Sequence, residues 1–241
     1  MELWGTTNRG VVREENQDAF QIEALSAQHM FAVVCDGMGG ARAGRVASTL
    51  AVDAFVERFT TLWAEDMSRP KDILLCAATA ANEQVHDKSV HDPACFGMGT
   101  TMVALYLSDG HAIVLNEGDS RAYHIKPDSI MQITQDHSLV EDLVRRGELT
   151  PDQARVHPHK NLITRALGAE ADLHADLFEF DVNSGEFIVM CSDGLSNLVS
   201  EQEILYEVLF GGSEEECCKR LLEIAINRGA PDNVTVVLAK C

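Results

Sequence analysis

Short β-rich runs joined by tight turns dominate the middle of this chain, and they constrain its fold more than any other feature. Residues 100–107 and 111–116 flank Ser108-Asp109-Gly110, which is a hairpin signal. Residues 121–125 and 130–134 flank a second polar turn. Strands that follow one another through tight turns pair antiparallel, whereas parallel strands need a long crossover between them. A doubly wound parallel sheet is therefore disfavoured.

Helical periodicity accompanies these strands. Apolar residues recur every three or four positions from 44 to 65, residues 72–86 are rich in alanine, and residues 213–227 open with the capping sequence Ser-Glu-Glu-Glu. Further apolar runs that predict strands are 31–35, 186–191 and 234–239. Hairpins combined with a few long helices predict an α+β fold, in which helices cover antiparallel sheets.

Composition narrows the classes of function. The chain has 19 Lys and Arg against 38 Asp and Glu, a formal net charge of −19. This surface repels phosphate backbones and anionic lipid, so we expect no nucleic-acid and no membrane partner. Seven Cys without a Cys-x-x-Cys pair argue against a disulfide framework and a thiolate zinc site. Without a signal-like leader, a long apolar run or a linker, we expect one cytoplasmic domain over 1–241.

Two apolar strands end in the same way. Residues 31–35 lead into Asp36-Gly37, and residues 187–191 lead, one residue later, into Asp193-Gly194. Such a strand places a carboxylate on a rigid element at the rim of the core, and the glycine lets the backbone turn sharply. Asp-Gly after a strand is also common in plain turns, and that alternative stays open for each pair taken alone.

Three other aspartates have comparable surroundings. Asp18 lies in a polar segment near the N-terminus, Asp119 directly precedes the strand at 121–125, and Asp232 precedes the last strand. If these chain ends meet, several carboxylates share a small volume, and like charges at short range need compensation. Oxygen donors without nearby Cys or His suit Mg²⁺ or Mn²⁺ rather than Zn²⁺.

Short motifs that include these aspartates occur in a fixed order along residues 4–239. They are Arg13-x-x-Asn16-Gln17-Asp18 and the segments 34–40, 97–101, 118–121, 136–138, 161–168, 191–195 and 232–235. Each motif alone is weak evidence, but the ordered set is specific. The chain resembles the metal-dependent serine/threonine protein phosphatases of type 2C, also called PPM-type phosphatases, and in particular their compact bacterial single-domain members.

The resemblance implies a four-layer α-β-β-α sandwich of two antiparallel sheets flanked by helices, with a flap subdomain at about 137–165. This flap has five basic and four acidic residues, a net charge of +1 in a chain of −19. We expect it to meet a phosphopeptide that the rest of the surface repels. Arg145 and Arg146 are the cations that the sequence suggests for this contact.

The resemblance also implies the composition of the active site. Two tightly bound Mg²⁺ or Mn²⁺ ions would be bridged by Asp36 and a water, and Arg13 would hold the substrate phosphate. Asp18, Asp193, Asp232 and the carbonyl of Gly37 would complete the metal ligands, with Asp18 placed to act through water. Asp119 would share a weaker third ion with Asp193.

The implied reaction is the hydrolysis of phosphoserine and phosphothreonine in proteins by direct attack of the bridging water on phosphorus. Met38 stands where many family members have a histidine proposed as general acid, so we expect a metal-bound water to protonate the leaving oxygen. Gln17 replaces a commoner glutamate that is not a primary ligand.

The substrates would be products of a cognate serine/threonine kinase, and the enzyme would act as a monomer. Two alternatives remain open. One is a catalytically inactive relative that binds phosphoproteins, which the complete set of carboxylates disfavours. The other is a binuclear hydrolase of small phosphate esters.

Overall fold

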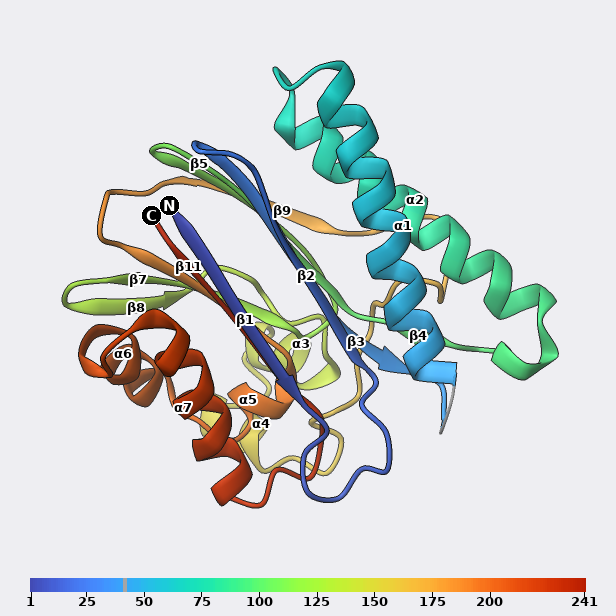
Figure 1. Ribbon diagram of the computed structural model, residues 1–241. Coiled ribbons are helices and arrows are strands. Elements are labelled where there is room, and N and C mark those ends of the chain that lie inside the picture. Colours follow the sequence, from blue (N-terminus) through green and yellow to red (C-terminus); the bar gives the residue numbers. More distant parts are fainter. Residues whose placement is uncertain (41–42) are drawn as a thin grey trace.

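Two antiparallel sheets lie face to face in the protein, as a computed structural model that describes residues 1–40 and 43–241 shows (Figure 1). The first sheet contains, in spatial order, β1 (Glu2–Asn8), β11 (Val234–Lys240), β10 (Phe187–Cys191), β7 (Arg121–Lys126) and β8 (Ser129–Gln132). The second contains β2 (Asp18–Ser26), β3 (His29–Met38), β5 (Met102–Ser108), β6 (His111–Glu117) and β9 (Asp176–Asp181), with the short β4 (Gly99–Thr100) beside β3. Both hairpins predicted from the sequence, β5–β6 and β7–β8, are present.

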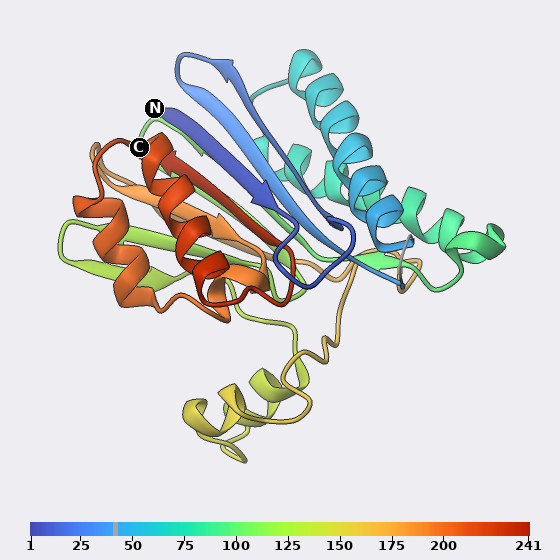
Figure 2. The same ribbon diagram turned by 60° about the horizontal axis from the view of Figure 1, so that its bottom comes forward.

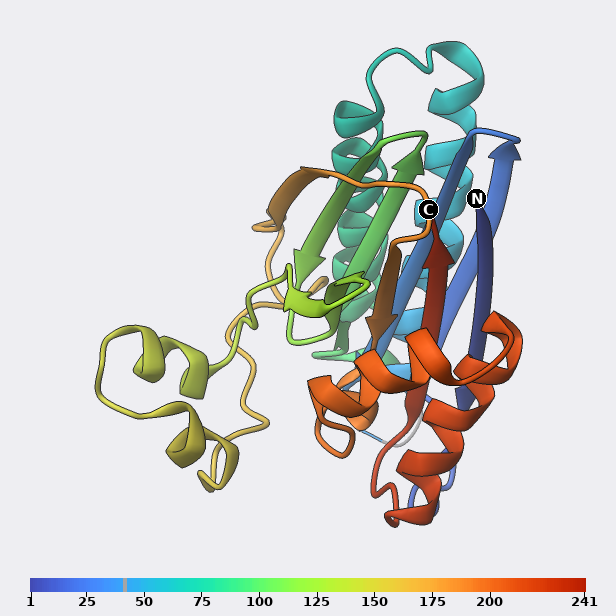
Figure 3. The same ribbon diagram turned by 90° about the vertical axis from the view of Figure 1, so that its left-hand side faces the viewer.

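Helices form the two outer layers. The long helices α1 (Ala43–Glu65) and α2 (Pro70–His91) pack together over the second sheet, and α2 leads into the 3₁₀ turn η1 (Pro93–Cys95). The helices α6 (Glu201–Phe210) and α7 (Glu214–Asn227) cover the first sheet, as the side view in Figure 3 shows. The predicted α+β sandwich with four layers is confirmed.

Strand β3 shows how the layers are held together. Phe31, Val33 and Cys35 pack into the apolar layer below α1 and α2, whereas Ala32 and Val34 belong to the layer between the two sheets. Successive side chains of a strand point to opposite faces, so both faces of β3 are buried. This two-sided burial explains why its sequence is continuously apolar instead of alternating with polar residues.

The flap, residues 137–165, leaves the sandwich and projects to one side of it (Figures 2 and 3). It contains two short helices, α3 (Leu139–Arg145) and α4 (Pro151–Arg155). An isolated bridge between Ser138 and Ile163 closes it at its base. No residue of α4 is buried. The flap is therefore held to the body mainly through its two ends.

The strands that sequence patterns did not predict are β1, β2 and β9, and all three are sheet edges. Their burial is mostly partial, because an edge strand has one unpaired side and less apolar cover. Their sequences consequently mix polar and apolar residues. Helix α6 was also missed, although Ser200 and Glu203 form a capping box at its start. Among the described residues, no helix is both long and apolar enough to cross a membrane.

Candidate active site

The predicted carboxylates lie where strands of both sheets begin or end. Asp18 opens β2 and stands directly opposite Asp36 in the register of β2 and β3. Asp193 follows β10 and begins the short helix α5 (Asp193–Ser196), and Asp232 lies just before β11. Asp119 lies in the turn between β6 and β7. The fold thus brings together aspartates that are far apart along the chain.

These chain ends surround a cavity of about 350 Å³, which we call the active-site cavity. The expected site residues that line it are Arg13, Asp36, Gly37, Asp119, Asp193 and Asp232. Asn161 and Ile163 of the flap also contribute to its wall. Met38 lines it as well, and no histidine is among its described lining residues. Their roles as ligands and phosphate binder stay predictions.

Asp18 is buried and is not among the residues that line the cavity. Its Oδ2 accepts hydrogen bonds from Ser192 Oγ at 2.8 Å and from Thr235 Oγ1 at 2.6 Å. Its Oδ1 and the Oδ1 of Asp193 are buried without a hydrogen-bond partner among the described residues. A buried acceptor without a donor costs free energy, and a cation is one way to compensate it.

Crowding changes the acidity of these carboxyl groups. Burial, together with neighbouring charges, raises the pKa of Asp18 to about 7, of Asp193 to about 6 and of Asp119 to about 8. Burial and then the charge of Asp18 raise the pKa of Asp36 well above its ordinary value. All of these shifts express the cost of bringing anions into a small, poorly hydrated volume. The donor set therefore fits a divalent cation with oxygen ligands.

Arg13 supplies a positive charge at this cavity. Its Nη2 donates a hydrogen bond to Asp232 Oδ2 at 2.6 Å. The residue expected to bind phosphate thus neutralises an expected metal ligand. Across residues 1–40 and 43–241, no group of three or more His, Cys, Asp or Glu side chains is arranged to hold an ion. The donors surround one cavity, but one oxygen of Asp232 is already engaged.

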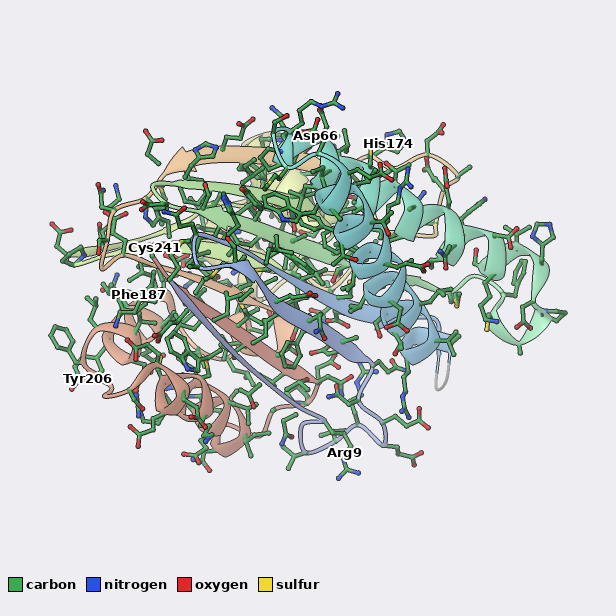
Figure 4. The ribbon with its side chains drawn as sticks, turned by 45° about the horizontal axis from the view of Figure 1, so that its top comes forward. Arg9, Asp66, His174, Phe187, Tyr206 and Cys241 are labelled. Carbon is green, nitrogen blue, oxygen red and sulfur yellow. The ribbon has the colours of Figure 1, made fainter. Side chains whose placement is uncertain are left out.

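Asn233 fixes the loop that carries Arg13, a role that sequence reasoning missed. Its Oδ1 accepts a hydrogen bond from the backbone N–H of Gln17 at 2.8 Å. Its Nδ2 donates to the carbonyl oxygens of Arg9 at 2.8 Å and Glu15 at 3.0 Å. Figure 4 labels Arg9 on this loop. The available signal was an amide, able to donate and accept, next to an expected metal ligand.

Thr101 joins the end of β3, which carries Asp36, to the turn that carries Asp119. Its Oγ1 accepts a hydrogen bond from the backbone N–H of Asp36 at 2.9 Å and lies 2.7 Å from Ser120 Oγ. The glycine after Asp36 is required by space, because a Cβ on Gly37 would lie 2.0 Å from the carbonyl oxygen of Gly44. This close approach sets the start of α1 against the end of β3.

Comparison with known proteins identifies the family. A family model described as protein phosphatase 2C matches residues 9–214. The chain belongs to this family. It is 34% identical over 238 residues to the serine/threonine phosphatase stp of Listeria innocua, and the match covers 97% of this chain and 93% of that protein. It is equally 34% identical to the protein phosphatase PhpP of Streptococcus pneumoniae, with 99% and 96% coverage.

Solved structures agree with this assignment. Serine/threonine phosphatase Stp1 from Staphylococcus aureus superposes with a TM-score of 0.93 at 34% identity, covering 100% of this chain and 94% of that one. The catalytic domain of the phosphatase PstP, crystallised with two manganese ions, superposes with a TM-score of 0.84 at 33% identity, covering 99% and 97%. The expected family and the expected class of enzyme, a serine/threonine phosphatase, are confirmed.

We predict that the metal-free protein loses stability as pH rises from about 5 to 8. Burial and charge raise the folded-state pKa of Asp18, Asp193 and Asp119 to between about 6 and 8. An unfolded Asp has a pKa of about 3.9. The folded state therefore holds these protons more tightly, so this stability is present below pH 4 and is lost as pH rises through the folded-state values. Urea denaturation in the presence of a chelator measures it.

Two controls accompany this measurement. Asp36→Asn removes one of the crowded charges, so its free energy of unfolding is expected to fall less between pH 5 and 8. Saturating Mn²⁺ is expected to reverse the fall. Glu203 contributes no change of stability over this range, because its hydrogen bond to Arg228 lowers its pKa to about 2. A free energy of unfolding that rises between pH 5 and 8 would contradict the prediction.

Proposed function

We propose that this protein is a metal-dependent phosphatase that hydrolyses phosphoserine and phosphothreonine in other proteins. The observation that carries the proposal is the convergence of half-buried aspartates and one arginine on the active-site cavity of a protein phosphatase 2C fold. Relatives along nearly the whole chain are named serine/threonine phosphatases, which supports the substrate class.

Two Mg²⁺ or Mn²⁺ ions are the proposed cofactors. Asp36, Asp193, Asp232 and the carbonyl of Gly37 would hold them, and Asp18 would act through a water. The unpartnered buried oxygens and the all-oxygen donor set support this choice. When bound, such ions activate a water as the nucleophile for direct attack on phosphorus and neutralise charge on the phosphate oxygens.

Arg13 is proposed to orient the phosphate. A guanidinium offers two parallel N–H groups that match two phosphate oxygens. In the structure it is bound to Asp232, so an ion and Arg13 compete for the same carboxylate. A cation on Asp232 therefore leaves Arg13 available for the substrate, which couples metal loading to substrate binding.

Protonation of the leaving serine or threonine oxygen needs a different group. Met38 has no titratable proton and occupies the cavity wall. Asp119 and Asp193 both line the cavity and repel one another electrostatically. We propose that they share a weaker third ion, which assists this proton transfer.

The proposed partners are phosphoproteins made by a cognate serine/threonine kinase, met by a monomeric enzyme in the cytoplasm. The net charge of −19 supports the exclusion of nucleic acid and anionic membranes. Hydrolysis of small phosphate esters alone is the second candidate. A groove along the flap favours protein substrates, because a small ester is too short to occupy it together with the active-site cavity.

Replacing Asp36 tests the proposed function. We expect Asp36→Asn to lower Mn²⁺-dependent phosphate release from a phosphothreonine peptide by about a hundredfold or more, as for loss of other charge-stabilising groups. Circular dichroism checks that the fold is kept. Asp53→Asn, an exposed position on α1, is the matched control and is expected to behave as wild type. Near-normal turnover by Asp36→Asn would refute the site.

Replacing Arg13 separates phosphate binding from metal binding. Arg13→Ala is expected to raise KM for a phosphopeptide about tenfold or more, because a charged hydrogen bond contributes about 1.5–3 kcal/mol. Its affinity for the two tight ions, measured by titration calorimetry, is expected to be kept or to rise, because a competitor for Asp232 is removed. Arg9→Ala, on the same loop, is the control. An unchanged KM would make Arg13 a structural residue.

Replacing Asp119 tests the third ion. Asp119→Ala is expected to keep both tight ions in calorimetry and to lower kcat. If the third ion assists the leaving group, the loss is smaller for an aryl phosphate, which leaves readily, than for an alkyl phosphate. Loss of the tight ions, or an equal loss on both substrates, would remove Asp119 from this role.

A further inference from the structure

A second cavity, of about 470 Å³, adjoins the active-site cavity along the flap, and we call it the flap groove. The two cavities share Asp119, Asn161 and Asp193 in their walls. The flap forms one side of the groove, and residues 196–201, which lead into α6, form another. A peptide whose phosphorylated residue reaches the active-site cavity therefore has a channel for its flanking residues.

Two cations line this groove from the flap. Arg155 ends α4, and Lys160 follows it in the next turn. Both side chains are exposed, and neither forms an ion pair with any residue that the structure describes. Arg121, the groove's other cation, is different because its Nε and Nη2 donate to Asp136 at 2.9 Å and 2.6 Å. Arg155 and Lys160 are thus free to bind an anion.

The groove also carries six carboxylates, and four of them have no ion pair with a described residue. Asp136 is paired with Arg121, and Glu203 is paired with Arg228 outside the groove. The remaining carboxylates are Asp119 and Asp193 of the proposed ion site, Glu141 on α3 and Glu201 at the start of α6. The α4 end of the flap therefore carries two unpaired cations in a chain of net charge −19, in a groove that also holds Glu141 and Glu201.

We propose that Arg155 and Lys160 form an anion subsite that recognises a negatively charged group near the phosphorylated residue of the substrate. This inference rests on the proposed function and names the substrate class more closely. A guanidinium and an ammonium both donate strong hydrogen bonds to a carboxylate or a phosphate. The group is a carboxylate side chain or a second phosphate, and the enzyme prefers acidic or multiply phosphorylated segments.

The structure favours other flap cations than the two that the sequence suggested. Arg145 is bound to Asp142 at 2.5 Å, and neither Arg145 nor Arg146 lines the groove. Arg146 is nevertheless a flap cation without an ion pair among the described residues. It therefore provides a matched control for charge on the flap that does not face the groove.

The test uses phosphothreonine peptides that carry Gln, Glu or phosphoserine at one flanking position. This position is varied on both the N-terminal and the C-terminal side of the phosphothreonine. Mass spectrometry follows the loss of phosphate from the threonine in the presence of Mn²⁺. We expect wild type to prefer Glu or phosphoserine over Gln at one or more positions by about fivefold in kcat/KM, the upper range for exposed charge pairs. The double variant Arg155→Gln, Lys160→Gln is expected to lose this preference.

The same variant is expected to keep wild-type turnover of the Gln peptides and of an aryl phosphate, and Arg146→Gln is expected to keep the preference. A preference for phosphoserine alone identifies a second phosphate as the ligand, and an equal preference for Glu shows that a carboxylate suffices. No preference in wild type, a preference kept in the double variant, or an equal loss on every substrate would overturn the subsite without touching the phosphatase activity.

Failure of wild type to release phosphate from any of these substrates contradicts the proposed function instead. Fluorescence anisotropy of labelled Glu and Gln peptides then still tests the subsite, because binding does not require turnover. Tighter binding of the Glu peptide that the double variant loses supports the subsite, and equal binding of both peptides refutes it.

Discussion

Repulsion among buried carboxylates at the ends of the strands is the constraint on which the rest of this structure depends. Asp18 and Asp36 face each other across β2 and β3, and burial raises the pKa of both. A fold that collects such groups needs positive charge or hydrogen-bond donors nearby. Here Arg13 binds Asp232, and two hydroxyls bind Asp18. The remaining unpartnered oxygens, on Asp18 and Asp193, favour the divalent cations that the protein phosphatase 2C family suggests.

The sandwich supplies the rigidity that this arrangement requires. Strand β3 is buried on both faces, so the carboxylate near its end has little freedom to move away from its neighbours. Single polar side chains then link the turns to one another. Thr101 joins the end of β3 to the turn of Asp119, and Asn233 connects the loop of Arg13 to the start of β11. Electrostatic strain is tolerated at the rim because the apolar layers beneath it are well packed.

The flap, in contrast to the strand ends, is exposed and weakly packed. Its helix α4 has no buried residue, and its free cations Arg155 and Lys160 lie on the surface. The proposed chemistry and the proposed substrate selection would thus lie in different parts of the molecule, the first at a rigid rim of strand ends and the second on an exposed, weakly anchored segment. Such a division lets charges on the flap change without disturbing the carboxylates.

The sequence by itself determined the strands of the interior, the two hairpins, the long helices and the aspartates at strand ends, because periodicity and turn chemistry are properties of neighbouring residues. The ordered motifs also identified the family. Edge strands such as β1 and β9 were not predicted, because their mixed polar and apolar pattern indicates a strand only when the partner strand is known. Tertiary structure alone decided that Arg13 meets Asp232, 219 positions away, and that Arg155 rather than Arg145 faces the groove. Such contacts depend on how distant elements pack, and no local pattern of residues encodes that packing.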